Sequence, residues 1–179
     1  MYSCDVLGRI SKGVGLRGGL PDIAGLTWRM PPPQDLRSGT PWDVLLASTL
    51  ANSRFLLAPT KSWSGTTFSS LMPFRSQGHL WWIRARVATH ISARGLSMDA
   101  IREQIDSDGL HFDIEQAPGA GPFQPLAHLT LRHVDPTRDD IAFDPVLHSD
   151  PDVDLVPAWL GSFRLAAYRE SREGRDPES

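Results

Sequence analysis

Arg164 and Tyr168 are the two residues whose types and spacing point most directly to chemistry. They lie four positions apart in a segment with helical periodicity, so on a helix the guanidinium and the phenol oxygen share one face. A fixed positive charge beside a phenol favours the phenolate and lowers a pKa that starts near ~10. A phenolate is a hard anionic axial ligand for ferric haem. The alternative interpretation is structural, with the aromatic side chain packed inward and the arginine at the rim.

A second set of polar side chains, His111, Asp113 and Glu115, alternates along one predicted strand and therefore shares one of its faces. Together with His128 they could serve a metal-dependent hydrolase of the phosphodiesterase type. The competing interpretation is that they face water, as polar residues on a half-buried strand usually do. The histidines show no HExxH spacing and the acids no dinuclear carboxylate pattern, so we expect a solvated strand face.

Two further patterns resemble binding loops but lack the residues that complete them. Residues 13–18 match the dinucleotide pattern GxGxxG, yet Pro21 follows and no helix begins there to face a pyrophosphate. Asp150, Asp152 and Asp154 copy the first ligands of a calcium loop, but the sixth and twelfth positions are leucine and glycine. We interpret the first pattern as a turn and the second as a solvated acidic loop.

Length and composition indicate one globular domain over residues 1–179, since 40% of the residues are hydrophobic. Eighteen basic and 21 acidic side chains give a formal charge of −3, which argues against nucleic-acid or membrane partners. Cys4 is the single cysteine, so an internal disulfide is excluded. The first ten residues do not resemble a secretory signal, and no apolar run approaches the ~20 residues of a membrane span. We therefore expect a cytoplasmic protein.

Fifteen glycines and 15 prolines divide the chain into short segments, which favours strands over long helices. A helix should begin after the cap residue Ser97 and run to about Ile105, with Gly109 just beyond it, and an amphipathic helix over 158–170 should precede a frayed tail over 173–179. This order predicts an α+β fold in which an antiparallel β-barrel or sheet carries helices at one end. The segments expected to be extended are 5–11, 23–30, 42–48, 54–58, 80–91, 110–115 and 126–134, while 62–74 could hold a helical turn.

Several short motifs resemble the haem-binding core of the catalase superfamily. Arg9-Ile10-Ser11 resembles that family's R-F-S strand, residues 22–26 resemble its D-x-x-G-F strand, and residues 42–49 resemble W-D-L-V-G-N-N-T. Nearer the C-terminus, residues 143–145 resemble F-N/D-P and residues 164–168 resemble R-L-F-x-Y, whose tyrosine binds iron. The resemblance covers most of the chain loosely and implies a catalase-like β-barrel with C-terminal helices.

The resemblance assigns roles in haem binding to particular residues. It implies that Tyr168 is the axial ligand to the iron with Arg164 as its charge partner, that Arg9 pairs with a haem propionate, and that Ser11 supports the distal side. Ser48 falls at the catalytic position of the distal asparagine, with a side chain that cannot present an amide.

The departures from the family pattern concern the groups that cleave peroxide. The distal histidine of catalases lies upstream of the R-F-S motif, whereas only eight residues precede Arg9. The first strand of the family's barrel is therefore not encoded in this sequence, so we expect one edge of the sheet to lie open.

These observations leave three functional hypotheses. The leading one is a degenerate catalase-like haem-binding protein that has weak peroxidase activity or none. The second is a hydrolase of the phosphodiesterase type. The third is a non-catalytic barrel that binds an apolar ligand, or that pairs with a partner, such as a second copy in a homodimer, through its open edge.

Overall fold

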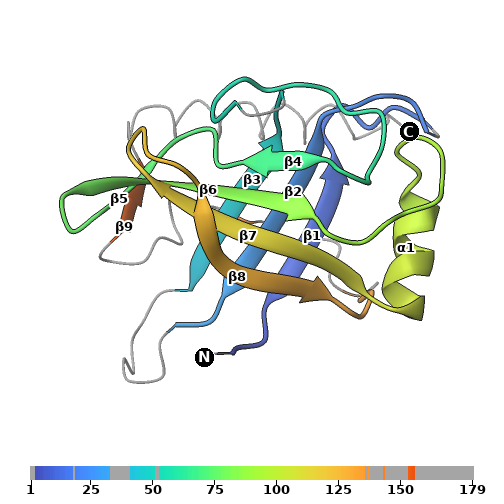
Figure 1. Cartoon of the computed structure of the whole chain (residues 1–179). Coiled ribbons are helices and arrows are strands. Elements are labelled where there is room, and N and C mark those ends of the chain that lie inside the picture. The colour runs from blue at the N-terminus through green and yellow to red at the C-terminus, as the bar shows by residue number, and fades with distance from the viewer. Residues whose placement is uncertain are drawn as a thin grey trace, which may run out of the picture.

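The computed structural model of the chain describes residues 3–17, 19–32, 41–50, 53–135, 137, 143 and 153–155. These residues form one nine-stranded sheet, in which the strand pairs are antiparallel, and one short helix. The sheet curls into a half-barrel (Figure 1), which confirms the predicted antiparallel, barrel-like architecture. The helix predicted over 158–170 lies outside the described residues.

Most strands follow one another across the sheet in chain order, with one branch. β1 to β4 pair in sequence, and β4 pairs with the C-terminal half of β6. The N-terminal end of β6 pairs instead with β5, which pairs with β9, while the other side of β6 pairs with β7 and then β8. The strands are β1 (Leu7–Lys12), β2 (Ala24–Met30), β3 (Trp42–Ser48), β4 (Thr67–Ser69), β5 (Phe74–Ser76), β6 (His79–Val87), β7 (Leu110–Pro118), β8 (Gln124–Leu131) and β9 (Val153–Leu155).

The two faces of the sheet differ because successive side chains of a strand point to opposite faces. One face, here called the core face, carries the apolar side chains that form a single buried cluster. Trp63, from the loop before β4, is 1% exposed and belongs to this cluster. The opposite face, here called the outer face, carries most of the charged side chains of the strands. Fully buried members of the cluster include Leu26, Val44, Phe68, Leu96, Leu110 and Phe112.

β1 and β8 are two of the three strands that end the branched sheet, and β9 is the third. Within the described residues, β1 pairs only with β2 and β8 only with β7. The two edges nevertheless meet, because a Cβ added to Gly8 in β1 would lie 2.4 Å from Cδ2 of Leu131 in β8. Glycine at this position allows the close approach. We call this line of side-chain contact, which carries no β1–β8 ladder, the seam.

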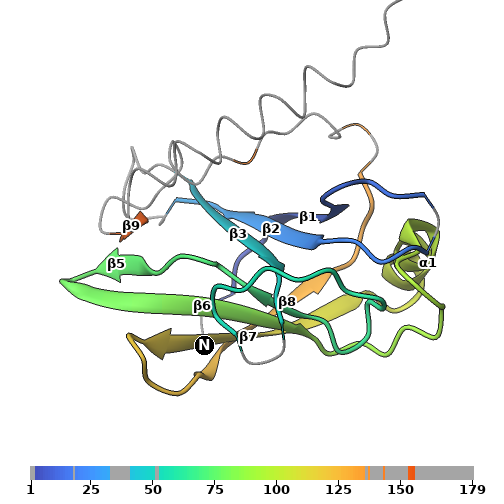
Figure 2. The same ribbon diagram turned by 90° about the horizontal axis from the view of Figure 1, so that it is seen from above.

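The helix α1 (Met98–Ser107) forms where the sequence predicts it and lies at one end of the half-barrel (Figures 1 and 2). Ser97 is the N-cap, since its Oγ accepts a hydrogen bond from the Ala100 N–H at 3.3 Å. Ile101 and Ile105 are buried in the core cluster, which attaches the helix to the sheet. Gly109 follows the helix with a φ of +82°, a conformation that suits glycine.

Three segments differ from the sequence-based expectation. The apolar run 54–58 forms a loop whose Phe55 and Leu56 are more than half exposed, with only a single bridge at Leu57. Segment 62–74 contains β4 in place of a helical turn. The acidic loop contains the short strand β9, which pairs with β5. Local secondary-structure propensity does not predict these features, because each depends on a partner strand that is distant in sequence or on the position that the loop takes in the fold.

Candidate functional site

Arg9 and Ser11 lie on the outer face of β1, next to β2. Arg9 is exposed and opposite Thr27, and Ser11 is opposite Gly25. A Cβ added to Gly25 would lie 2.6 Å from Ser11 Oγ, so the absence of a side chain there makes room for the serine hydroxyl. Thr27 is 9% exposed, and its Oγ1 is buried with no hydrogen-bond partner. The structure therefore brings two of the predicted residues together beside an unsatisfied buried hydroxyl.

Ser48, the third described residue of the predicted site, points to the opposite face. It is 1% exposed and lies opposite Phe68 of the core cluster. Its Oγ accepts the Ala24 N–H at 3.0 Å and donates to the Ala58 carbonyl at 2.7 Å. Both hydrogen bonds connect β3 to other segments of the backbone, so Ser48 has a structural role and does not converge with Arg9 and Ser11.

Arg164 and Tyr168 lie outside the described residues. Their predicted roles as charge partner and axial ligand therefore stay predictions from the sequence.

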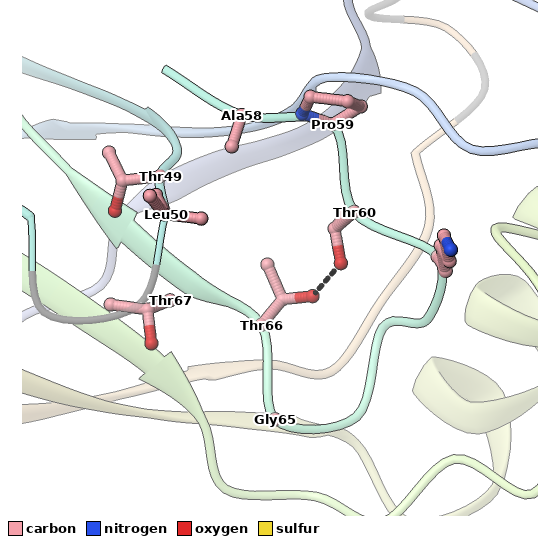
Figure 3. A pocket seen from close by; sticks show the side chains of 9 residues that line it. Thr49, Leu50, Ala58, Pro59, Thr60, Gly65, Thr66 and Thr67 are labelled. Carbon is pink, nitrogen blue, oxygen red and sulfur yellow. Dashed lines mark hydrogen bonds between the residues drawn. The ribbon is translucent and has the colours of Figure 1, made fainter. Parts of the chain in front are cut away.

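A recess opens beyond the end of β3, and sequence reasoning did not find it. It has a volume of about 290 Å³ and is lined by residues 49–50, 58–61 and 65–67. Four of these residues are threonines, and Thr60 and Thr66 are joined by a 2.9 Å hydrogen bond between their hydroxyls (Figure 3). Thr49 Oγ1 is buried without a hydrogen-bond partner. The threonine-rich segments were the available sequence signal, but only the fold places them around one space.

An ion pair between Arg29 and Asp43 lies on the same face as Arg9 and Ser11. Arg29 Nε and Nη2 donate to the two oxygens of Asp43 at 2.6 and 2.7 Å, and the Asp43 side chain is 0% exposed. The hydrogen bond to Asp43 raises the pKa of Arg29. The Arg29 guanidinium also lies 5.4 Å from the ring centroid of Phe143. Asp43 belongs to the motif that resembles W-D-L-V, and its carboxylate is engaged with Arg29 across the two strands.

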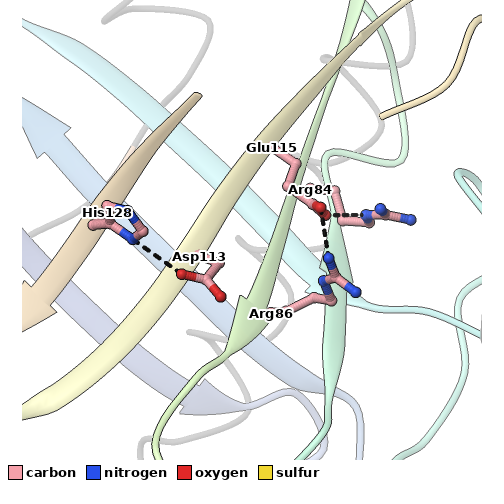
Figure 4. Close-up of polar contacts among 5 residues, drawn as sticks. All are labelled: Arg84, Arg86, Asp113, Glu115 and His128. Atoms are coloured by element: carbon pink, nitrogen blue, oxygen red, sulfur yellow. Dashed lines mark hydrogen bonds and ion pairs between the residues drawn. The ribbon is translucent and has the colours of Figure 1, made fainter. Parts of the chain in front are cut away.

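The polar residues of β7 fall into separate groups (Figure 4). On the outer face, Glu115 accepts hydrogen bonds from Arg84 Nε at 2.7 Å and Arg86 Nη2 at 2.6 Å. Asp113 contacts His128 at 3.0 Å. His111 instead contacts Thr130 and the Asp108 carbonyl. Within the part of the chain that the structure describes, no three His, Cys, Asp or Glu side chains are placed to hold a metal ion.

Glu115 corrects the expectation that this strand face is solvated. Its side chain is only 9% exposed, although Arg86 beside it is 53% exposed. Burial raises the pKa of Glu115, but the hydrogen bonds and charges of Arg84 and Arg86 lower it by more, so the pKa lies below its usual value. Arg84 in turn stacks 3.8 Å above the Phe123 ring. These contacts hold the ladder of β6 and β7 and engage both oxygens of Glu115 with arginines.

Residues 13–17, the described part of the glycine-rich segment, form a turn, as predicted, and backbone amides of this turn bind a carboxylate that belongs to the chain itself. Asp22 is 1% exposed and accepts the N–H groups of Val14 at 2.9 Å, Leu16 at 3.0 Å and Ile23 at 2.7 Å. Burial raises the pKa of this carboxyl, but these backbone hydrogen bonds lower it by more, so the pKa lies below 3.8. The donors that a nucleotide phosphate would need are therefore already occupied.

Comparisons with protein-family models, with curated proteins and with solved structures find no match to this chain. None of the described residues forms a helix with the length and apolar content that crossing a membrane requires.

Proposed function

We propose that this protein is a non-catalytic, catalase-like haem-binding protein. The observation that supports the proposal is the cluster on the outer face of β1 and β2, where Arg9 and Ser11 adjoin the unsatisfied buried hydroxyl of Thr27. An unpaired buried hydroxyl destabilises the folded state unless a ligand or water completes it. A haem propionate can accept hydrogen bonds from both the Arg9 guanidinium and the Thr27 hydroxyl, and it would give that hydroxyl a partner.

The residues of the proposed site act by binding and orientation. Arg9 supplies a fixed cation for a propionate, and Ser11 supplies a second hydroxyl on the same face. Tyr168 is proposed as the axial ligand, with Arg164 favouring its phenolate form. When bound, ferric haem supplies a Lewis-acidic and redox-active iron.

We propose that the protein does not catalyse a reaction because of the orientation and hydrogen bonding of Ser48. A group that assists bond cleavage has to reach the bound substrate. Ser48 points away from Arg9 and Ser11, and its hydroxyl already makes two hydrogen bonds. We therefore expect haem uptake without catalase turnover and with negligible peroxidase turnover.

The proposal is tested by titrating the purified protein with haemin and following the Soret band. Tyr168→Phe should change the ferric spectrum and lower the affinity at least tenfold, whereas Tyr2→Phe, at the other tyrosine of the chain, should not. Arg9→Gln should weaken binding several-fold, as expected for loss of one exposed charge pair, while Arg132→Gln, also at an exposed arginine, should not. Equal haemin uptake by all of these variants would refute the assignment.

A second candidate function is homodimerisation through the open edges. β8 is an edge strand within the described residues, and its Leu126 is 48% exposed. Exposed strand edges favour pairing with another chain, and a charge on the edge opposes it. If the protein is a dimer by light scattering, Leu126→Lys should produce a monomer, whereas Leu80→Lys on the inner strand β6 should not. A monomeric wild-type protein would exclude this candidate.

A further inference from the structure

We propose that the loop between β3 and β4 binds the surface of a lipid bilayer that contains anionic headgroups. The described part of this loop, residues 50 and 53–57, is here called the apolar loop. It lies against the outer face of β4 and β6 and uses none of the residues assigned to haem, so the proposal is independent of the proposed function. The proposal rests on exposed apolar side chains, on the contacts that hold the loop in place, and on the separation of charge along the chain.

The apolar loop exposes several large apolar side chains at one place. Leu50, Phe55, Leu56 and Leu57 are each more than half exposed. Single exposed apolar residues are ordinary on a globular protein, but several of them together mark a surface that contacts a partner or a membrane. The half-buried Trp82 of β6 lies beside them, with its ring centroid 6.5 Å from that of Phe55. Tryptophan is enriched where proteins meet the headgroup layer of a bilayer.

Polar contacts hold the apolar loop in place. Ser53 Oγ accepts the N–H groups of Leu56 at 2.9 Å and of Phe55 at 3.3 Å. Ser69 Oγ in β4 donates to the Arg54 carbonyl at 2.6 Å, and the Arg54 guanidinium donates to two carbonyls between β7 and β8. The polar groups of the loop therefore bind the protein, while its apolar side chains are exposed. A loop held in this way contacts a membrane without a further entropic cost of ordering.

Charge is distributed unevenly along the chain. Residues 44–98, which include the apolar loop, contain six Lys and Arg residues and no Asp or Glu, so their formal charge is +6. The remaining residues hold 12 basic and 21 acidic side chains and carry −9. The net charge of −3, which argues against a membrane partner when it is taken alone, therefore conceals a basic segment around the exposed leucines.

Three cations lie close to the apolar loop. Arg54 is part of it, and Lys61 lines the same recess as Leu50. Arg86 of β6 is opposite Thr67 of β4, which also lines that recess. Within the part of the chain that the structure describes, neither Arg54 nor Lys61 makes an ion pair, so no acid compensates their charges.

Two acids, Glu115 and Asp113, share the outer face of the sheet with these cations. Glu115 accepts hydrogen bonds from both Arg84 and Arg86, so two cations share one carboxylate. Asp113 contacts His128. Positive charge therefore remains in excess beside the apolar loop, and it is complementary to anionic headgroups.

The type of exposed side chain favours a bilayer over other anionic partners. Leucines beside cations match the boundary between acyl chains and anionic headgroups. A single-stranded nucleic acid instead requires aromatic faces on which its bases stack. Three of the four exposed apolar side chains of the loop are leucines, so the loop fits the bilayer better.

The test measures sedimentation of the full chain with vesicles. The protein should bind vesicles of equal parts phosphatidylcholine and phosphatidylglycerol about tenfold more tightly than vesicles of phosphatidylcholine alone, and added salt should remove the difference. Leu56→Ser should weaken binding about tenfold, whereas Leu20→Ser, at another leucine that is just over half exposed, should not. Lys61→Gln should weaken binding about fivefold, while Arg132→Gln, also at an exposed cation, should leave it unchanged.

A fluorescent label locates the contact. Cys4 is the single cysteine, so Cys4→Ser allows an environment-sensitive fluorophore to be attached at Leu56→Cys or, as the control, at Leu20→Cys. On addition of the mixed vesicles, the emission of the label at position 56 should shift to the blue and gain intensity. The emission of the label at position 20 should not change.

Several outcomes would overturn the proposal. These are no binding to the mixed vesicles, equal binding to phosphatidylcholine alone, equal losses in Leu56→Ser and Leu20→Ser, and equal responses of the two labels. Binding to a thymidine oligonucleotide without binding to vesicles would assign the basic segment to nucleic acid in place of a membrane.

Discussion

Replacing Ser48 by alanine distinguishes a structural from a catalytic role at the position that resembles the distal asparagine of catalases. The substitution leaves two backbone groups without partners, the buried Ala24 N–H and the half-buried Ala58 carbonyl. Each group left unsatisfied costs about 1–2 kcal/mol, so the free energy of unfolding should fall by about 3 kcal/mol. For a chain of this size, that loss corresponds to a decrease in Tm of about 9 °C.

The measurement is urea unfolding at pH 7 followed by tryptophan fluorescence, in parallel with haemin titration of the folded variant. Ser92→Ala is the matched control, because Ser92 is exposed and makes no hydrogen bond among the described residues. We expect Ser48→Ala to lose stability while it retains haemin affinity. A variant within 0.5 kcal/mol of the wild type would refute the structural role.

Three further substitutions test the polar contacts. Asp22→Asn puts an NH₂ group against a backbone N–H donor and should destabilise by about 2 kcal/mol at pH 7. Because the pKa of Asp22 is lowered on folding, its carboxylate stabilises the folded protein fully above pH 3.8. This stabilisation is lost as the pH falls through the lowered pKa, so the free energies of unfolding of wild type and variant, measured in urea, should converge in acid. Glu115→Gln should cost about 2 kcal/mol by leaving the partly buried Arg84 charge unpaired, and this difference should likewise shrink in acid, since the pKa of Glu115 is lowered. Thr27→Val should raise the free energy of unfolding of the haem-free protein by about 1 kcal/mol, measured by thermal melting; a loss of stability would show that the hydroxyl has a partner.

The sequence predicts those elements whose signals are local. The strand over 42–48 has the predicted limits because its short apolar run is bounded by proline-rich and polar segments. The helix follows from a cap, a hydrophobic stripe and a terminal glycine, and Ser97, Ile101 and Gly109 have these roles in the structure. The short strands β5 and β9 lack such signals, since three residues become a strand only through the partner beside them.

The candidate site depends more strongly on information that is absent from a single sequence. The alternation of polar residues along β7 places Asp113 and Glu115 on one face, but the sequence does not specify the register that puts Arg84 opposite Glu115. Likewise, Arg9 and Ser48 belong to motifs of the same resemblance, and only the pairing of β1, β2 and β3 shows that they point to opposite faces. Which buried hydroxyl lacks a partner is a property of three-dimensional packing, so Thr27 and Thr49 could not be found from their sequence context.

The seam has a consequence for local opening of the folded protein. Since β1 and β8 meet through the Leu131 side chain against Gly8 and without a ladder, the sheet can part there while the pairing of β1 with β2 and of β7 with β8 persists. Amide protons that face this gap should exchange with deuterium far faster than those directed into the neighbouring strands. A side chain at position 8 would need the space that the terminal methyl of Leu131 occupies, so the Leu131 side chain would have to change its conformation for the two strands to stay in contact.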